Sequence, residues 1–188
     1  KQCIVLIPEI ALTYQTLLRF YKRFGDAVSV MHSRLSAGER YDQMKRAKRG
    51  EVQVMIGPRS ALFTPFQKLG LIIIDEEHET SYKSDSMPKY HAREVAVHLA
   101  EMTDACVVMG SATPSLEAHY RAQQGIYKKY VLSERIGDAV LPEVQIVDMR
   151  QELAGGNSSI FSRHLETAIA DRLEKRQQVM LFLNRRGI

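Results

Sequence analysis

Long apolar runs are missing from this sequence of 188 residues. The longest purely hydrophobic stretches span about five residues, whereas a membrane-spanning helix needs roughly 20. The composition does not favour disorder, because hydrophobic residues make up 45% of the chain and charged residues 26%, both near the average for globular proteins. We therefore expect a folded domain with a substantial core.

Cysteine is also scarce. Cys3 and Cys106 each lie inside an apolar run, which is typical of buried, reduced thiols in an intracellular protein, with a disulfide between them as the alternative. No Cys-x-x-Cys or His-Glu-x-x-His pattern occurs in the sequence. His91, Glu94 and His98 share a helix face by their spacing, but such a face is more often exposed than zinc-binding.

The charge and the two chain ends add two expectations. A net charge of +4 and an isoelectric point near 9.1 weakly indicate a polyanionic partner. The first residue is Lys1, a strand-like segment begins by the third residue, and LFLNRRGI stops within a motif. We therefore expect a piece of a longer protein.

Short apolar runs rich in β-branched residues alternate with helical patterns. Such runs are typical of parallel strands that are buried on both faces. The predicted strands are residues 3–7, 27–31, 52–56, 71–74, 105–109, 144–147 and 179–183. The predicted helices are a segment opening at Pro8, residues 37–49 behind a Ser36/Glu39 capping box, residues 91–102 and 114–124, and residues 163–175 behind Ser162. This alternation predicts an α/β fold with a parallel sheet flanked by helices.

The chain becomes irregular between Ser133 and Ser162, where it contains two glycines and an asparagine in succession. We predict one lobe over residues 1–135, a passage between lobes over residues 136–161, and the beginning of a second lobe over residues 162–188. A surface loop within a single domain is the alternative interpretation.

The segment LIIIDEEHET places three acids and a histidine directly after a predicted strand. The carboxyl ends of parallel strands form the ligand crevice of an open sheet, so Asp75 would project there. Adjacent carboxylates repel one another, and a divalent cation with nucleotide phosphates would offset that repulsion. We expect Asp75 to hold Mg²⁺ through water and Glu76 to orient or deprotonate an attacking water, with His78 bonding to a neighbouring loop. A solvated loop is the alternative.

Two other strand ends carry polar residues. The run at 105–109 is followed by GSATPS, a small hydroxyl-bearing turn that can pack close to the acidic loop. The run at 52–56 is followed by GPRSALFTPF, where Arg59, Ser60, Thr64 and backbone amides suit phosphate oxygens. An internal salt bridge is the alternative for Arg59.

About fifteen residues between Glu76 and Tyr90 show no periodicity, and loops of that length are usually functional or disordered. Single-strand binders combine aromatic faces, which stack on bases at about 1–3 kcal/mol each, with cations that follow the phosphates. The loop and its end supply Tyr82, Lys83, Lys89, Tyr90, His91 and Arg93. A surface loop held in place by its tyrosines is the alternative. In the separate segment 37–49, the many basic residues favour a solvated helix face.

Together these motifs resemble a known family. DEEH after an aliphatic strand, followed about 35 residues later by GSATPSLE, is similar to motifs II and III of superfamily 2 helicases of the DExH group. YKSDSMPKYHAREVAVHLA, LIPEIALTYQ, IGPRSALFTPF and LFLNRRGI resemble segments of the family of primosomal protein N′, the PriA replication-restart helicases. Another DExH translocase such as RecG, or a non-catalytic nucleic-acid-binding module, is the alternative.

The resemblance implies a RecA-like first lobe and the start of a second lobe. It implies ATP- and Mg²⁺-dependent 3′-to-5′ unwinding of DNA in replication restart and primosome assembly, in the cytoplasm at the nucleoid. The implied partners are single-stranded and forked DNA, primosome proteins and single-strand-binding protein. It assigns Asp75 and Glu76 to metal binding and hydrolysis, and His78, Ser111 and Thr113 to coupling the nucleotide state to DNA.

Three parts of that family's machinery do not occur within the 188 residues. These are a Gly-x-x-x-x-Gly-Lys-[Ser/Thr] loop, the arginine finger motif of the second lobe, and a zinc-binding cysteine cluster. In the family the first lies upstream of the matching region and the other two lie downstream. We therefore expect zinc only in the complete protein, and no ATPase activity from this chain alone.

Overall fold

The structure is a computed structural model that describes residues 1–8, 11–134 and 141–183. The chain forms two compact units, Lys1–Tyr130 and Val131–Ile188. The predicted boundaries between lobes stay a prediction. Within the described ranges, no helix has both the length and the apolar character to cross a membrane.

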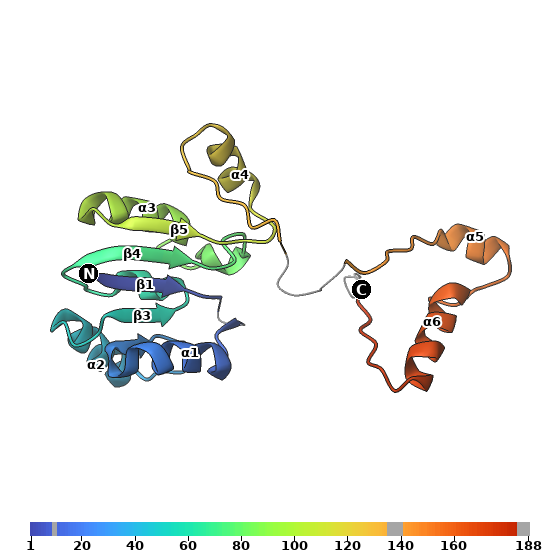
Figure 1. Ribbon diagram of the computed structural model, residues 1–188, viewed down its shortest axis with the longest axis horizontal. Coiled ribbons are helices and arrows are strands. Elements are labelled where there is room, and N and C mark those ends of the chain that lie inside the picture. The colour runs from blue at the N-terminus through green and yellow to red at the C-terminus, as the bar shows by residue number, and fades with distance from the viewer. Residues whose placement is uncertain (9–10, 135–140, 184–188) are drawn as a thin grey trace. The chain divides into compact units, whose positions relative to one another are not determined.

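The first unit contains a five-stranded sheet in which every pair of neighbours is parallel. The strand order is β2-β3-β1-β4-β5 (Figure 1). The strands are β1 (Gln2–Leu6), β2 (Val28–Val30), β3 (Val54–Gly57), β4 (Leu69–Ile74) and β5 (Cys106–Met109). The α/β class and the five strands predicted in this unit are therefore confirmed.

Four α-helices accompany the sheet in the part of this unit that the structure describes, and hydroxyl caps fix where several of them begin. They are α1 (Tyr14–Phe24), α2 (Ala37–Lys48), α3 (Ala92–Thr103) and α4 (Leu116–Gln123). The predicted capping box at the start of α2 is confirmed, because Ser36 Oγ accepts from Glu39 N and Glu39 Oε2 accepts from Ser36 N. Such a box stabilises a helix by satisfying two free amides.

The predicted start of the first helix at Pro8 is wrong. The α1 helix begins six positions later, behind Thr13, whose Oγ1 accepts a hydrogen bond from Thr16 N at 3.3 Å. Ala11 N donates to Pro8 O at 2.8 Å, and residues 12 and 13 are not helical. A good cap closer to the amphipathic stretch prevails over a proline that is merely compatible with a first turn.

The second unit contains α5 (Met149–Ala154) and α6 (Arg163–Glu174). The predicted cap of α6 is confirmed, because Ser162 Oγ accepts from Leu165 N at 3.1 Å. Residues 144–147 and 179–183 do not form strands, which corrects two predictions. Ile146 is 96% exposed and Phe182 88% exposed, because no strand among the described residues of this unit pairs with them. Residues 184–188, the end of the LFLNRRGI motif, lie outside the described residues.

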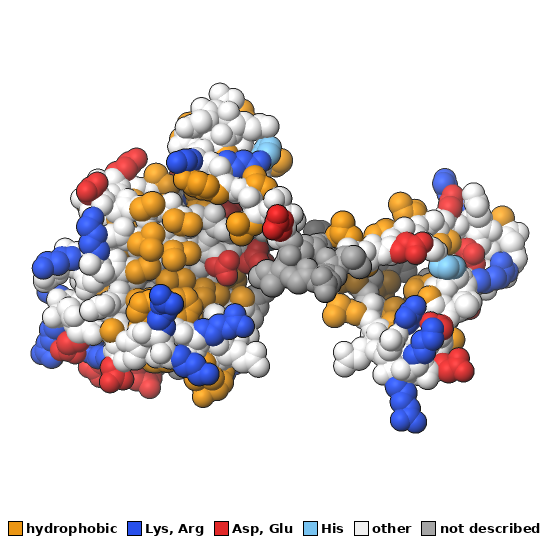
Figure 2. Space-filling view, in the orientation of Figure 1, with side chains coloured by type: hydrophobic (Ala, Val, Ile, Leu, Met, Phe, Trp, Pro, Cys, Tyr) orange, Lys and Arg blue, Asp and Glu red, His pale blue; other side chains and the backbone are white. Residues whose placement is uncertain are grey.

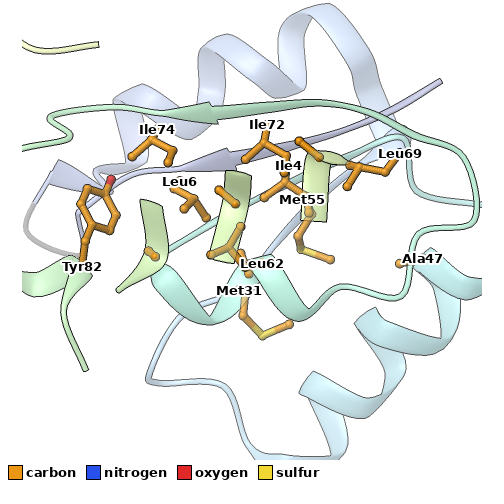
Figure 3. Packing of buried hydrophobic residues seen from close by; sticks show 14 of the residues in the cluster. Ile4, Leu6, Met31, Ala47, Met55, Leu62, Leu69, Ile72, Ile74 and Tyr82 are labelled. Atoms are coloured by element: carbon orange, nitrogen blue, oxygen red, sulfur yellow. The ribbon is translucent and has the colours of Figure 1, made fainter. Parts of the chain in front are cut away.

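Buried side chains form a core on each face of the sheet. On one face the core lies under α2 and α3 and includes Ile4, Leu6, Ile72 and Ile74, with the Tyr82 ring at one end (Figure 3). On the other face α1 covers a second cluster, which contains Val5, Ile7, Val28, Val54 and Ile56. Each fully buried aliphatic side chain contributes about 1.5–3 kcal/mol.

On the α1 side, the apolar surface extends beyond the region that α1 covers. Figure 2 shows hydrophobic side chains gathered over β1, β4 and β5 on this side. We call Cys3, Leu71, Ile73, Cys106 and Val108 the open face. Leu71 lies beside Cys106 and Ile73 beside Val108 in the register, and Val108 is 48% exposed. The edge strand β5 therefore presents apolar side chains to solvent, whereas proteins usually cover or pair such an edge.

The open face corrects the prediction that both cysteines are buried. Cys106 is exposed, Cys3 is half-buried, and both thiols are free. Burial raises the pKa of the Cys3 thiol to about 11. The strand β4 separates the two residues in the register, so they are about 9–10 Å apart, too far for a disulfide.

Candidate functional site

The acidic segment begins where β4 ends, at the carboxyl edge of the sheet. Asp75 N donates to Leu6 O of β1 at 2.9 Å, and Glu77 N donates to Gly110 O at 3.0 Å. Gly110 follows β5 and donates its own N–H to Ile74 O at 2.8 Å. Backbone hydrogen bonds thus attach the segment to the ends of both neighbouring strands, where open parallel sheets bind ligands.

Glu76 has a left-handed backbone with φ of +47°. This conformation costs a residue with a side chain roughly 1–2 kcal/mol, and it persists where the surrounding structure enforces it. Glu76 N donates to Asp75 Oδ1 at 3.1 Å, and Glu76 O accepts from Glu79 N at 2.9 Å. The strained residue is therefore held from both sides, and its side chain is 44% exposed.

The three acids have different environments. Asp75 is exposed and Glu76 is partly exposed, whereas Glu77 is only 3% exposed. The described residues contain no group of three or more His, Cys, Asp or Glu side chains that could hold a metal ion. Mg²⁺ in phosphate-handling sites uses one or two carboxylates and takes its other ligands from water and phosphate. The exposed Asp75 carboxylate fits that requirement by itself.

The histidine and hydroxyl residues expected to couple nucleotide to DNA lie together. His78 Nδ1 is 2.7 Å from Ser111 Oγ, and His78 Nε2 is 3.5 Å from Thr113 Oγ1. Ser111 Oγ also accepts from Thr113 N at 3.0 Å. A second neighbour of His78 Nδ1 is Glu76 Oε2, at 3.6 Å. The imidazole therefore bridges the acidic segment and the turn after β5, and its coupling role stays a prediction.

Arg93 does not lie where the sequence placed it. We expected a DNA ligand, but Arg93 is 6% exposed. Its Nη1 lies 3.1 Å from Glu77 Oε2 and donates to Ser115 Oγ at 2.8 Å. A guanidinium buried against a carboxylate is unavailable to phosphate.

Two other expected DNA ligands are buried as well. Tyr82 is 1% exposed, and its hydroxyl donates to Asp75 O at 2.6 Å. Burial, followed by the nearby acids, raises the pKa of the Tyr82 hydroxyl. Thr64 is 7% exposed, and its Oγ1 donates to Ala61 O at 2.7 Å. The buried Tyr82 therefore packs against the acidic segment and has no free ring face on which a base could stack.

The remaining predicted DNA ligands are at least partly accessible. Ser60 and Lys83 are exposed, and the half-buried Tyr90 ring packs edge-on against Phe63 with centroids 5.4 Å apart. Arg59 has no ion-pair partner within the described part of the chain, but its Nη1 donates to Ser81 O at 2.7 Å and to Lys83 O at 2.9 Å. Arg59 thereby holds the loop that carries Lys83.

His91, Glu94 and His98 do not converge on one point. His91 Nδ1 accepts from Arg93 N at 3.2 Å and caps α3, and burial is the main cause that lowers the His91 pKa. Glu94 pairs with Arg121 at 3.1 Å, and His98 lies beside Glu101. The interpretation of an ordinary helix face is therefore favoured over a zinc site.

A cavity of about 270 Å³ opens at the ends of the first three strands in the sequence. Three of its lining residues are histidine or arginine, namely His32, Arg40 and Arg59, and none is acidic. Arg40 Nη2 donates to Ser33 O at 3.0 Å, which holds the guanidinium at the cavity. The lining is Pro8, His32, Ser33, Arg40, Pro58, Arg59, Ser60, Ser81 and Tyr82. This composition suits an anionic group such as a phosphate.

Comparison with known proteins identifies the family of this chain. Residues 1–121 match the family described as DEAD/DEAH box helicase. The chain belongs to this helicase family.

Relatives in the comparison match this chain over its whole length. It is 53% identical over 187 residues to "Replication restart protein PriA" of Bacillus subtilis (strain 168). It is 51% identical over 192 residues to the protein of that name from Synechocystis sp., and 46% identical over 189 residues to the one from Chlamydia trachomatis. The alignments cover 100% of this chain but 23%, 23% and 25% of the relatives. The predicted resemblance is confirmed, and the chain spans about a quarter of these relatives' length.

Two residues that matter to the site were not identified from the sequence, namely Glu77 and Ser115. Glu77 reads as one more acid in DEEH, and Ser115 as part of a flexible turn. Ser115 Oγ accepts from Ala118 N at 3.3 Å and caps α4, so a serine before a helical pattern was the available signal. No local signal distinguishes Glu77 from Glu76, because its partner Arg93 is 16 positions away.

Proposed function

We propose that this chain is part of an ATP- and Mg²⁺-dependent DNA helicase that moves 3′-to-5′ and acts in replication restart and primosome assembly. One observation carries the proposal. Asp75 is exposed at the end of β4, and the partly exposed Glu76 has its Oε2 3.6 Å from His78 Nδ1. His78 Nδ1 in turn lies 2.7 Å from Ser111 Oγ, which follows the neighbouring strand β5. This arrangement connects the candidate hydrolytic acids, through His78, to the turn after β5. The relatives' name favours a restart helicase over the alternative of a RecG-like translocase.

In this proposal the two exposed acids have separate roles. Asp75 would hold the Mg²⁺ that accompanies ATP through a water, and the ion would supply positive charge beside the phosphates. Glu76 accepts a proton from the attacking water, since its carboxylate is accessible and its backbone is held in one conformation. His78 responds to the state of that site through Ser111 and Thr113. These assignments rest on position and on the chemistry of the side chains.

The proposal requires a phosphate-binding loop that the 188 residues do not contain. The open face supports this requirement, because an additional strand beside β5 and its helix would cover exposed Cys106 and Val108. Soluble proteins usually cover or pair an apolar edge of this kind. The acidic segment would then be one half of a nucleotide site, completed by residues of the longer protein.

We further propose that DNA approaches the side of the sheet edge where the basic cavity lies. Arg40 and Arg59 would contact the phosphates, Ser60 and Lys83 would add to that surface, and Tyr90 would stack on a base. Arg93, Tyr82 and Thr64 are not kept as ligands because they are buried. Single-stranded and forked DNA are the proposed substrates, with primosome proteins and single-strand-binding protein as partners.

The direct test is strand separation by the complete protein. Two partial duplexes, one with a 3′ single-stranded tail and one with a 5′ tail, are incubated with ATP and Mg²⁺. We expect unwinding of the duplex with the 3′ tail, because a 3′-to-5′ motor enters the duplex from that tail. We expect no unwinding without ATP. DNA binding without ATP-dependent unwinding of either duplex would favour the non-catalytic module instead.

A further inference from the structure

Glu77 and Arg93 form the single ion pair, within residues 1–8, 11–134 and 141–183, whose side chains are both buried. Their side chains are 2% and 7% exposed. Burying two charges costs free energy that only close pairing and additional hydrogen bonds offset. The pair is therefore a costly feature at a position directly between Glu76 and His78.

The pair joins three segments of the chain. Glu77 Oε1 accepts from Ser115 N at 2.6 Å, and Glu77 Oε2 accepts from Ser115 Oγ at 3.0 Å. Arg93 Nη1 donates to Glu77 Oε2 at 3.1 Å and to Ser115 Oγ at 2.8 Å. We call Glu77, Arg93 and Ser115 the clamp. It connects the acidic segment with the first turn of α3 and with the residue that caps α4.

The clamp gives the turn after β5 a second attachment to the acidic segment. Ser111 near the start of that turn contacts His78, and Ser115 at its end contacts Glu77. The two attachments differ in character. The Glu77 and Arg93 side chains of the clamp are buried against each other. His78 is 32% exposed, and its Nδ1 has both Ser111 and Glu76 as neighbours. One end of the turn is therefore fixed, while the contact at the other end can exchange.

The clamp also lies next to the loop proposed to contact DNA. Lys83 and His91 form an antiparallel bridge, and Ser84 N donates to Tyr90 O at 2.8 Å. The loop therefore closes just two residues before Arg93. A displacement of Tyr90 or Lys83 would therefore be transmitted to the acidic segment through the buried contact between Arg93 and Glu77.

We propose that Glu77 and Arg93 are positioning residues that transmit DNA contact to the hydrolytic acids by fixing the turn of Ser111 and Thr113 against the acidic segment. This inference rests on the proposed function. It predicts that weakening the clamp leaves ATP binding intact and reduces the stimulation of hydrolysis by DNA. Glu94 Oε1 lies 3.3 Å from Arg93 Nε and 3.1 Å from Arg121 Nη1. We assign Glu94 and Arg121 no such role, because the Glu94 side chain is 50% exposed and surface pairs contribute little.

The test measures ATP hydrolysis by the complete protein with and without single-stranded DNA. The variants are Glu77→Gln, Arg93→Lys and the double variant, and Glu101→Gln on the exposed side of α3 is the matched control. We expect each single variant to lower the ratio of stimulated to basal kcat by about fivefold or more, with the KM for ATP within about twofold of wild type. The double variant should be no worse than the more impaired single variant, because the two residues act as a unit.

Different failures have different meanings. A wild-type protein without DNA-stimulated hydrolysis contradicts the proposed function itself. A wild-type ratio in both single variants overturns the clamp, and so does an equal loss of basal and stimulated rates together with a lowered Tm, which a purely structural role would give. Should Glu77→Gln not fold, Arg93→Lys, which keeps the positive charge, decides by the same criteria.

Discussion

Glu76→Gln in the complete protein is expected to reduce DNA-stimulated ATP hydrolysis about a hundredfold or more, the range typical for removing a general base. Glutamine keeps the size of the side chain and a carbonyl oxygen, but it cannot accept a proton from water. The change adds no bulk at the left-handed position, where φ is +47°. DNA binding should stay close to wild type, as measured by the fluorescence anisotropy of a labelled single strand.

Glu79→Gln is the matched control for this prediction. Glu79 lies in the same acidic segment, and its backbone N–H donates to Glu76 O, but we assign no step to its carboxylate. We expect its turnover to stay within about twofold of wild type. Unchanged turnover in Glu76→Gln would remove Glu76 from the mechanism, and lost DNA binding in that variant would point to misfolding.

Arg93→Met is expected to lower the free energy of unfolding of the 188-residue chain by about 3–5 kcal/mol, because it leaves the buried Glu77 carboxylate without a counter-charge. Methionine retains much of the apolar volume of the arginine stem, so packing changes little. Urea unfolding followed by circular dichroism measures the effect. The sequence alone placed Arg93 among the DNA ligands.

Arg121→Met provides the comparison. The Arg121 side chain is 32% exposed and pairs with Glu94, and exposed pairs contribute about 0–1 kcal/mol. A large difference between the two variants is therefore expected. Equal, small losses of stability, with Arg93→Met binding DNA more weakly, would return Arg93 to the DNA surface.

The strands of the first unit were predictable from the local hydrophobic pattern because their pairing partners lie within the same unit. The runs at 71–74 and 105–109 are apolar on successive positions, and both pair with adjacent strands. The runs at 144–147 and 179–183 have the same composition but no pairing strand among the described residues of their unit. Composition gives the tendency to form a strand, whereas pairing depends on what else is present.

The candidate site was predictable to the level of strand ends and no further. The rule that ligands gather at the carboxyl ends of parallel strands brought His78 and Ser111 together across 33 positions. The same reasoning failed for Tyr82, Thr64 and Arg93, because residue type does not determine whether a side chain turns inward. Glu77 and Arg93 are buried by their mutual pairing, which is a tertiary property that no spacing in the sequence encodes.

The most direct measurement compares ATP hydrolysis by the 188-residue chain and by the complete protein, each with and without single-stranded DNA. The central claim is that the acidic segment forms one half of a nucleotide site whose phosphate-binding half lies elsewhere in the longer protein. We expect no turnover above background from the 188 residues, and DNA-stimulated turnover from the complete protein. Robust hydrolysis by the 188 residues, or none by the complete protein, would contradict the claim.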